Sequence, residues 1–185
     1  DIPDLVQQDV ADLGIVGLNV IEEKRLAFQS SGIKNLFEQL MLLDHGRCRL
    51  CITVPDEFKY QGAQSLQGKR IATTYPNILG NYLKQNKVNA EIVTLSGAVE
   101  IAPRLGRADL ICDLVSTGAT LIANHLTEVE TVLESQAAII RTPLPVSDSK
   151  QEWIHRLMMR VNGVQQVRES KYILLHAPRA KLEQI

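Results

Sequence analysis

Small hydroxyl-bearing residues follow a short apolar run near the middle of this 185-residue chain. The apolar run spans residues 110–115, and a helix can begin at Leu121. The turn between them consists of Ser116, Thr117, Gly118, Ala119 and Thr120. Such a strand, loop and helix start can form an anion site, because loop amides point outward and the helix dipole favours negative charge. Hydroxyl donors and small side chains, which let the backbone approach closely, predict that the turn binds a phosphate.

A carboxylate lies just before this turn, at the end of the predicted strand. Asp113 cannot bind phosphate directly, since like charges repel, but it can accept hydrogen bonds from sugar hydroxyls or help to hold a ligand-bound metal. Together the turn and the carboxylate indicate a phosphosugar site. The alternative for an isolated stretch of this composition is a buried strand, a glycine turn and a capped helix. A Walker A loop is excluded, because no Gly-Lys-Ser or Gly-Lys-Thr follows.

Alternating strands and helices are predicted around this motif. Strands are expected at residues 70–74, 90–95 and 109–115, and helices at residues 76–86 and 99–105. This alternation is typical of an α/β fold with a parallel sheet covered by helices. In such sheets ligands bind at the carboxyl ends of the strands, which is where the 116–120 turn lies.

The flanking segments predict further elements of the same kind. Before residue 70 we expect a helix at 2–10, a strand at 12–16, a helix capped by Asn19, and strands at 37–43 and 48–54 joined by a turn at 44–46. After residue 124 we expect strands at 127–133 and 137–141, a long helix capped by Asp148 or Ser149, a strand at 171–177 and a helix from 178.

Two stretches of the chain echo each other. Residues 10–17, VADLGIVG, and residues 107–114, RADLICDL, share an Ala-Asp-Leu step into a buried strand that ends in a small-residue turn before a helix. Two such units indicate a two-lobed architecture, in which the turn at Asn19 mirrors the 116–120 loop.

Composition excludes several classes of function. Hydrophobic residues make up 45% and charged residues 22%, as in a globular protein, and no apolar run reaches the ~20 residues of a membrane span. A net charge of −1 does not suggest a nucleic-acid or acidic-membrane partner. Cys48 and Cys51 form a lone CxxC within a predicted strand, where their side chains would point to opposite faces, so we expect free thiols and a reducing cytoplasm.

Four segments together resemble the ATP phosphoribosyltransferase family, the first enzyme of histidine biosynthesis. They are ADLGIVGLNVIEE from residue 11, GKRIATTYP from 68, SGAVEIAPRLGRADLICDLVSTGATLIAN from 96 and RESKYILLHAP from 168. The resemblance implies a two-lobed catalytic core like that of type II periplasmic binding proteins, followed by the start of an ACT-like regulatory domain, as in the long form. The implied reaction joins ATP and phosphoribosyl pyrophosphate and releases Mg-pyrophosphate, with Mg²⁺ arriving on the substrate. Histidine inhibition of the full-length parent and a homo-oligomer of two to six chains are also implied.

The resemblance assigns roles to individual residues. The 116–120 loop would hold the 5-phosphate, while Glu100 and Asp113 would bind the ribose hydroxyls directly or through Mg²⁺. Contacts to ATP or pyrophosphate are expected from five further residues: Asn19, Arg49, Lys69, Arg70 and Tyr75.

The resemblance also predicts how the chain is divided. Residues 1–45 and 126–168 would form lobe I, residues 46–125 lobe II with the phosphoribosyl loop, and residues 169–185 the start of the regulatory domain. The family's first strand and its Lys/Ser-Gly-Arg loop have no counterpart here, so the chain is expected to be a fragment whose own activity is left open. Two alternatives remain. One is a non-catalytic two-lobed module that binds a phosphorylated metabolite, and the other, less favoured because the phosphate loop is complete, is a silent regulatory subunit.

Overall fold

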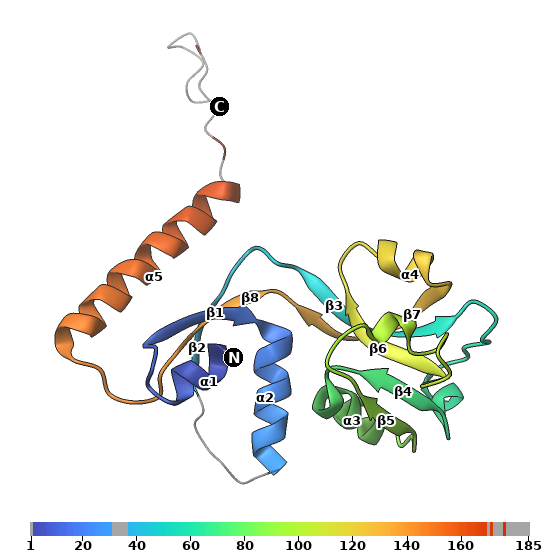
Figure 1. Cartoon of the computed structure of the whole chain (residues 1–185). Coiled ribbons are helices and arrows are strands. Elements are labelled where there is room, and N and C mark those ends of the chain that lie inside the picture. Colours follow the sequence, from blue (N-terminus) through green and yellow to red (C-terminus); the bar gives the residue numbers. More distant parts are fainter. Residues whose placement is uncertain (1, 31–36, 170, 172–175, 177–185) are drawn as a thin grey trace. The chain divides into compact units, whose positions relative to one another are not determined.

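Two β-sheets organise the larger part of the molecule (Figure 1). The computed structural model describes residues 2–30, 37–169, 171 and 176. It divides into two units, Asp1–Pro145 and Val146–Ile185.

The smaller sheet has three antiparallel strands in the order β1 (Leu13–Gly17), β8 (Ala137–Arg141) and β2 (Glu38–Leu42). Helices α1 (Ile2–Gln7) and α2 (Leu18–Ser30) pack against this sheet. Burial alternates along β1, because successive side chains point to opposite faces of a sheet. The buried face forms a core of Val6, Val16, Ile21, Ala138 and Ile140.

The larger sheet has five strands in the order β5 (Glu91–Thr94), β4 (Arg70–Thr73), β6 (Leu110–Val115), β3 (Cys48–Pro55) and β7 (Leu126–Ser135). β4 is parallel to both of its neighbours, as predicted, whereas β3 is antiparallel to β6 and to β7. The sheet is therefore mixed rather than parallel. Its carboxyl edge, defined here as the edge where β4, β5 and β6 end, also carries the start of β3 and the end of β7.

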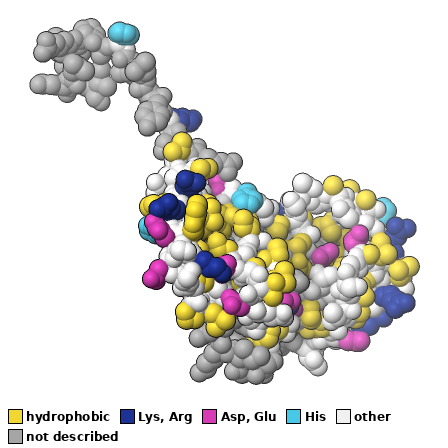
Figure 2. Space-filling model, turned by 60° about the vertical axis from the view of Figure 1, so that its left-hand side comes forward, with side chains coloured by type: hydrophobic (Ala, Val, Ile, Leu, Met, Phe, Trp, Pro, Cys, Tyr) yellow, Lys and Arg dark blue, Asp and Glu magenta, His cyan; other side chains and the backbone are white. Residues whose placement is uncertain are grey.

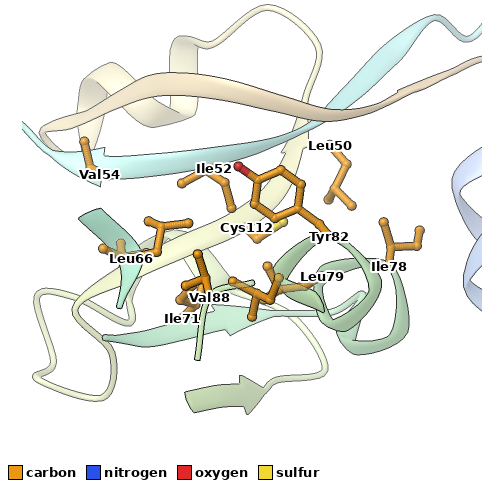
Figure 3. Close-up of a cluster of buried hydrophobic side chains, with 12 residues drawn as sticks. Leu50, Ile52, Val54, Leu66, Ile71, Ile78, Leu79, Tyr82, Val88 and Cys112 are labelled. Atoms are coloured by element: carbon orange, nitrogen blue, oxygen red, sulfur yellow. The ribbon is translucent and has the colours of Figure 1, made fainter. Parts of the chain in front are cut away.

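Each face of the larger sheet has its own hydrophobic core. Helix α3 (Pro76–Gln85) and the 3-10 turn η1 (Ala63–Leu66) contribute to one core, which includes Leu50, Ile52, Leu79 and Cys112 (Figure 3). The other core gathers Cys51, Ile111 and Val115 with residues of η2 (Val99–Ile101) and α4 (Ala119–Ala123). The helix predicted at residues 99–105 is only this short 3-10 turn followed by further turns.

The chain passes between the two sheets at residues 43–47 and again at Gln136. The two passages are hydrogen-bonded to each other, from the Leu43 amide to the Ala137 carbonyl (2.7 Å) and from the Ala137 amide to the His45 carbonyl (3.0 Å). Residues 44–46 therefore do not close a hairpin, because β2 and β3 belong to different sheets. The second passage lies at Gln136 rather than at residue 126, where the sequence had placed the return to lobe I, because β7 pairs with β3 along its length.

The second unit contains α5 (Asp148–Glu169), the long helix expected from the sequence. Its predicted apolar stripe is divided, since Ile154 is buried while Leu157 and Val164 are exposed. Figure 2 shows hydrophobic side chains exposed among charged ones on one face of the molecule, and Trp153 and Met159 are also exposed. The predicted strand at 171–177 and helix from 178 lie outside the described residues, apart from Lys171 and His176.

Among the residues described, no helix combines the length and hydropathy needed to cross a bilayer.

Candidate functional site

A pocket of about 330 Å³ opens at the carboxyl edge of the larger sheet. Its lining comprises Glu100, Asp113, Leu114, Val115, Ser116, Thr117, Gly118, Thr120 and Leu121. The structure thus brings Glu100 from η2 together with Asp113 from β6 and with all of the predicted phosphate loop except Ala119.

The loop owes its shape to one glycine. Gly118 has φ +78°, a left-handed conformation that L side chains rarely adopt, and its carbonyl accepts the Leu121 amide at 3.1 Å to start α4. An added Cβ at Gly118 would meet nothing within 4 Å, so the space beside the loop is open. Helix α4 has only five residues, and its dipole is correspondingly small. An anion in this pocket would therefore be bound mainly by the amides and hydroxyls of the loop and less by the dipole of α4.

Two carboxyl groups lie in the same pocket. Burial raises the pKa of the Asp113 carboxyl above its ordinary value, and the charge of Glu100 raises it further, while the Leu114 amide opposes both effects. Neither carboxyl has an ion-pair partner in the part of the chain that the structure describes. Ligand hydroxyls or a cation carried by a ligand would relieve this repulsion. A third His, Cys, Asp or Glu that would complete a metal cluster is not found among the described residues.

Asn19 and Tyr75 are brought into contact with each other. The Asn19 Nδ2 donates to the Tyr75 hydroxyl at 2.8 Å. Burial, followed by smaller contributions from Asp113 and Cys48, raises the pKa of Tyr75, while the Asn19 and Thr74 hydrogen bonds lower it. The prediction that Asn19 caps α2 is wrong, because the helix begins at Leu18 and the Asn19 side chain is bonded elsewhere.

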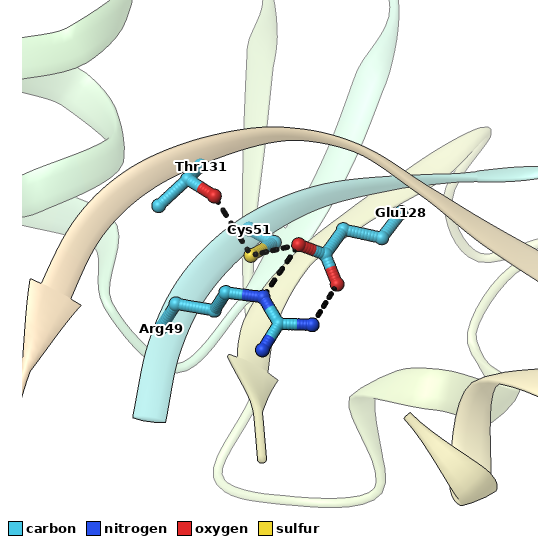
Figure 4. Close-up of polar contacts among 4 residues, drawn as sticks. All are labelled: Arg49, Cys51, Glu128 and Thr131. Carbon is cyan, nitrogen blue, oxygen red and sulfur yellow. Dashed lines mark hydrogen bonds and ion pairs between the residues drawn. The ribbon is translucent and has the colours of Figure 1, made fainter. Parts of the chain in front are cut away.

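Arg49 is held by a carboxylate of a neighbouring strand (Figure 4). Its Nε and Nη2 each donate to Glu128 at 2.6 Å, and these bonds lower the pKa of Glu128. The Cys51 thiol donates to Glu128 at 3.2 Å, and burial, followed by this bond, raises the pKa of Cys51 to about 12. Arg49 is paired across the ladder with Val115, next to the loop, but contact with a phosphate stays a prediction.

Lys69 and Arg70 lie at the opposite edge of the sheet from the pocket. They stand at the start of β4, whereas the pocket opens where β6 ends, and the two strands are parallel. The Lys69 Nζ lies 5.7 Å from the centre of the Phe58 ring. Arg70 Nη2 donates to Asp109 at 2.9 Å, which lowers the pKa of Asp109. The structure does not bring either cation to the pocket, and a substrate contact by either stays a prediction.

Glu23 has a role that sequence reasoning missed. The Glu23 carboxylate accepts the amides of Asn77 and Ile78, each at 2.9 Å, at the start of α3. The available signal was indirect. Helix α3 begins at Pro76 after a tyrosine, with no Ser, Thr, Asp or Asn of its own at the N-cap.

Comparisons with known proteins agree with this geometry. Residues 1–163 match the model of the ATP phosphoribosyltransferase family. The structure is similar to the ATP phosphoribosyl transferase (HisG:HisZ) complex from Thermotoga maritima, with a TM-score of 0.72 and 26% identity over 89% of this chain and 75% of that one.

More distant matches share the fold alone. The alkanesulfonate-binding protein SsuA from Xanthomonas axonopodis pv. citri, bound to MOPS, has a TM-score of 0.58 and 17% identity over 90% of this chain and 60% of that one. The periplasmic aliphatic sulphonate binding protein SsuA from Escherichia coli has a TM-score of 0.59 and 13% identity over 89% of this chain and 59% of that one. They confirm the predicted two-lobed fold of the periplasmic-binding-protein type. With residues 1–163 matched, the chain belongs to the ATP phosphoribosyltransferase family.

Proposed function

We propose that this chain transfers the phosphoribosyl group of phosphoribosyl pyrophosphate to N1 of ATP and releases pyrophosphate, as the first step of histidine biosynthesis. The observation that carries the proposal is the pocket in which a loop of small hydroxyl-bearing residues lies beside Glu100 and Asp113. A phosphate requires hydrogen-bond donors and ribose hydroxyls require acceptors, and the pocket lining includes both hydroxyl groups and carboxyl groups.

The loop would hold the 5-phosphate. Thr117 and Thr120 line the pocket and can donate their hydroxyl protons, and the missing side chain of Gly118 leaves room for the phosphate to approach the backbone. Glu100 and Asp113 would accept hydrogen bonds from the ribose hydroxyls, which orients the sugar and its C1 toward ATP.

In the reaction the bond from C1 to the pyrophosphate oxygen breaks, and a bond from C1 to N1 of adenine forms. No side-chain nucleophile is required, because the adenine nitrogen attacks. Positive charge grows on the ribose as the leaving group departs, and the two carboxylates stabilise that charge. Holding both substrates in line supplies much of the remaining acceleration. A Mg²⁺ ion carried by the substrate would neutralise the departing pyrophosphate, and Glu100 and Asp113 are the oxygen donors in the pocket that could bind it.

ATP and the pyrophosphate would be bound by residues among the five predicted from the sequence. Tyr75 and Asn19 lie at the carboxyl edge, and Arg49 is paired with Val115 beside the loop, so these three are the better placed candidates for ATP or pyrophosphate. Lys69 and Arg70 are less favoured as ATP or pyrophosphate contacts, because they lie at the edge of the sheet opposite the pocket. A cytoplasmic location, a homo-oligomer and inhibition of the full-length parent by histidine belong to the same proposal.

Turnover with both substrates tests the reaction. Incubation with ATP and phosphoribosyl pyrophosphate should release pyrophosphate and produce the ultraviolet absorbance of the adduct, in this chain or in its full-length parent. If the parent forms no adduct, the transferase is rejected. Calorimetric binding of phosphoribosyl pyrophosphate without turnover would then favour the alternative, a non-catalytic module, which the fold shared with solute-binding proteins also permits.

A further inference from the structure

One face of α2 holds the segment between β4 and α3. Asn19 and Glu23 are four residues apart, so their side chains lie on the same face of the helix. Asn19 donates to the hydroxyl of Tyr75 at 2.8 Å. Glu23 accepts the amides of Asn77 and Ile78, which begin α3 directly after Tyr75 and Pro76. The tyrosine is therefore fixed at its hydroxyl and at the backbone that follows it.

The same asparagine is bonded to the passage between the sheets. The Ser135 hydroxyl donates to Asn19 Oδ1 at 2.8 Å and accepts the Asn19 amide at 3.0 Å. Ser135 is the last residue of β7, and the carbonyl of Gln136 after it accepts the Leu18 amide at 2.9 Å. Asn19 is 6% exposed, and all three of its side-chain and backbone bonds to Tyr75 and Ser135 are buried or partly buried. In such surroundings the loss of one partner leaves the others unsatisfied, which makes the bonds depend on one another.

Tyr75 stands on the pocket's edge of the sheet without lining the pocket. It lies two residues after Thr73, which is paired with Cys112, the residue before Asp113. The pocket that is complementary to phosphoribose includes Asp113 but not Tyr75. In the proposed reaction the acceptor nucleotide must bind beside that pocket, and Tyr75 is assigned to it on this ground.

We propose that Asn19 is a positioning residue, which holds the Tyr75 hydroxyl for the acceptor nucleotide and couples it to the passage between the sheets through Ser135. The role of Tyr75 toward the acceptor nucleotide rests on the proposed function. The coupling of Tyr75 to Ser135 through Asn19 does not depend on turnover. Each of these two claims can therefore be refuted without the other.

Kinetics test the substrate half. Asn19→Ala and Tyr75→Phe remove the same hydrogen bond, so each should raise KM for ATP about tenfold, which corresponds to roughly 1.4 kcal/mol. KM for phosphoribosyl pyrophosphate should stay unchanged. Because the two substitutions break one bond, the double variant should be no worse than the poorer single variant. Equal increases in both KM values, or additive losses in the double variant, would overturn the assignment.

The matched control is Asn86→Ala. Asn86 Nδ2 donates to the Tyr82 carbonyl at 2.9 Å, so this variant also loses an asparagine side-chain hydrogen bond, but outside the network. It should lower the melting temperature and leave both KM values unchanged. If it raises KM for ATP as Asn19→Ala does, the effect reflects stability and not positioning.

Amide hydrogen exchange tests the coupling without substrate. Tyr75→Phe should accelerate exchange of the Asn19 amide, although the acceptor of that amide, the Ser135 hydroxyl, is itself left in place by the substitution. Asn86→Ala should not accelerate it. An unchanged Asn19 amide in Tyr75→Phe would refute the coupling while the proposed reaction stands. Conversely, a wild-type chain and parent that form no adduct would refute the reaction while the exchange result still decides the coupling.

Discussion

Asp113 and Glu100 line one pocket, where burial and then the charge of Glu100 raise the pKa of Asp113, and neither carboxyl forms an ion pair with the described part of the chain. A site that keeps two carboxyl groups together without a protein cation gives up stability for function.

Asp113→Asn should separate activity from stability. A folded-state pKa above the unfolded value means that stability is lost as the pH rises through the folded pKa. The uncharged amide avoids this loss, so the variant should be at least as stable as the wild type at pH 8, with a smaller difference in acid. Its kcat/KM should fall about 100-fold, because a group that stabilises the transition state is removed. Thermal unfolding at both pH values and steady-state assays provide the measurement. A variant with full activity would contradict the assigned role.

Glu100→Gln should move the acid side of the pH–activity profile. The charge of Glu100 raises the pKa of Asp113, so its removal should lower that pKa and extend activity to lower pH, although the maximal rate falls. The profile of kcat/KM against pH measures the shift. A profile that moves in the other direction, or does not move, would show that the two carboxyls are not coupled.

Gly118→Val should weaken binding of phosphoribosyl pyrophosphate by at least about tenfold, because the new side chain would occupy the space beside the loop. The left-handed φ of +78° also predicts a loss of stability of about 1–2 kcal/mol. Gly68→Val is the matched control, with φ +70°, equally open surroundings and a position at the other edge of the sheet. It should lose similar stability and keep its affinity in calorimetry. Binding that survives Gly118→Val would reject the loop as the phosphate site.

Glu128→Gln should reduce the acid sensitivity of the fold. Arg49 lowers the pKa of Glu128, so the pair stabilises the protein above the unfolded pKa and is lost as the pH falls through the lower folded value. The wild type should exceed the variant in urea midpoint at pH 7, and the difference should shrink as the pH falls below the ordinary glutamate value of 4.5. The exposed Glu57 serves as the control position, where Gln should leave the urea midpoint at pH 7 close to that of the wild type. A constant difference between wild type and Glu128→Gln at all pH values would contradict the assignment.

The three thiols should differ in reactivity. Burial raises the pKa of Cys51 to about 12 and also raises that of Cys112, whereas Cys48 is partly exposed. Because the thiolate is the reactive form, iodoacetamide at pH 8 should modify Cys48 first in the native protein and all three in denaturant. Peptide mass spectrometry identifies the sites. Modification of Cys51 before Cys48 would contradict the described packing.

The pocket was predictable from sequence because its parts are local. The apolar run, the small-residue turn and Asp113 are consecutive, and their geometry follows from one strand that ends in one loop. Glu100 became a candidate only through the family resemblance, since a carboxylate on a short helical turn carries no signal of its own. The structure places it in the pocket because η2 packs on the same face of the sheet as β6.

Pairing over long distances was not predictable. Arg49 and Glu128 are 79 residues apart, and nothing local to either shows that the cation is already bound. The antiparallel direction of β3 depends on partners on both sides of it in the sheet. The position of Lys69 and Arg70 could have been anticipated, because residues that begin a parallel strand lie at the edge opposite the ligand.

Gln136 is the single residue between the last residue of β7 and the first of β8. β7 pairs with β3 up to Ser135, β8 pairs with β1 from Ala137, and the other connection, at residues 43–47, is hydrogen-bonded to Ala137. A shift of one residue turns every side chain of a strand to the opposite face. The length of this connection is therefore fixed by both sheets at once. A residue inserted beside Gln136 would therefore have to be accommodated by a change in the pairing of β7 or of β8.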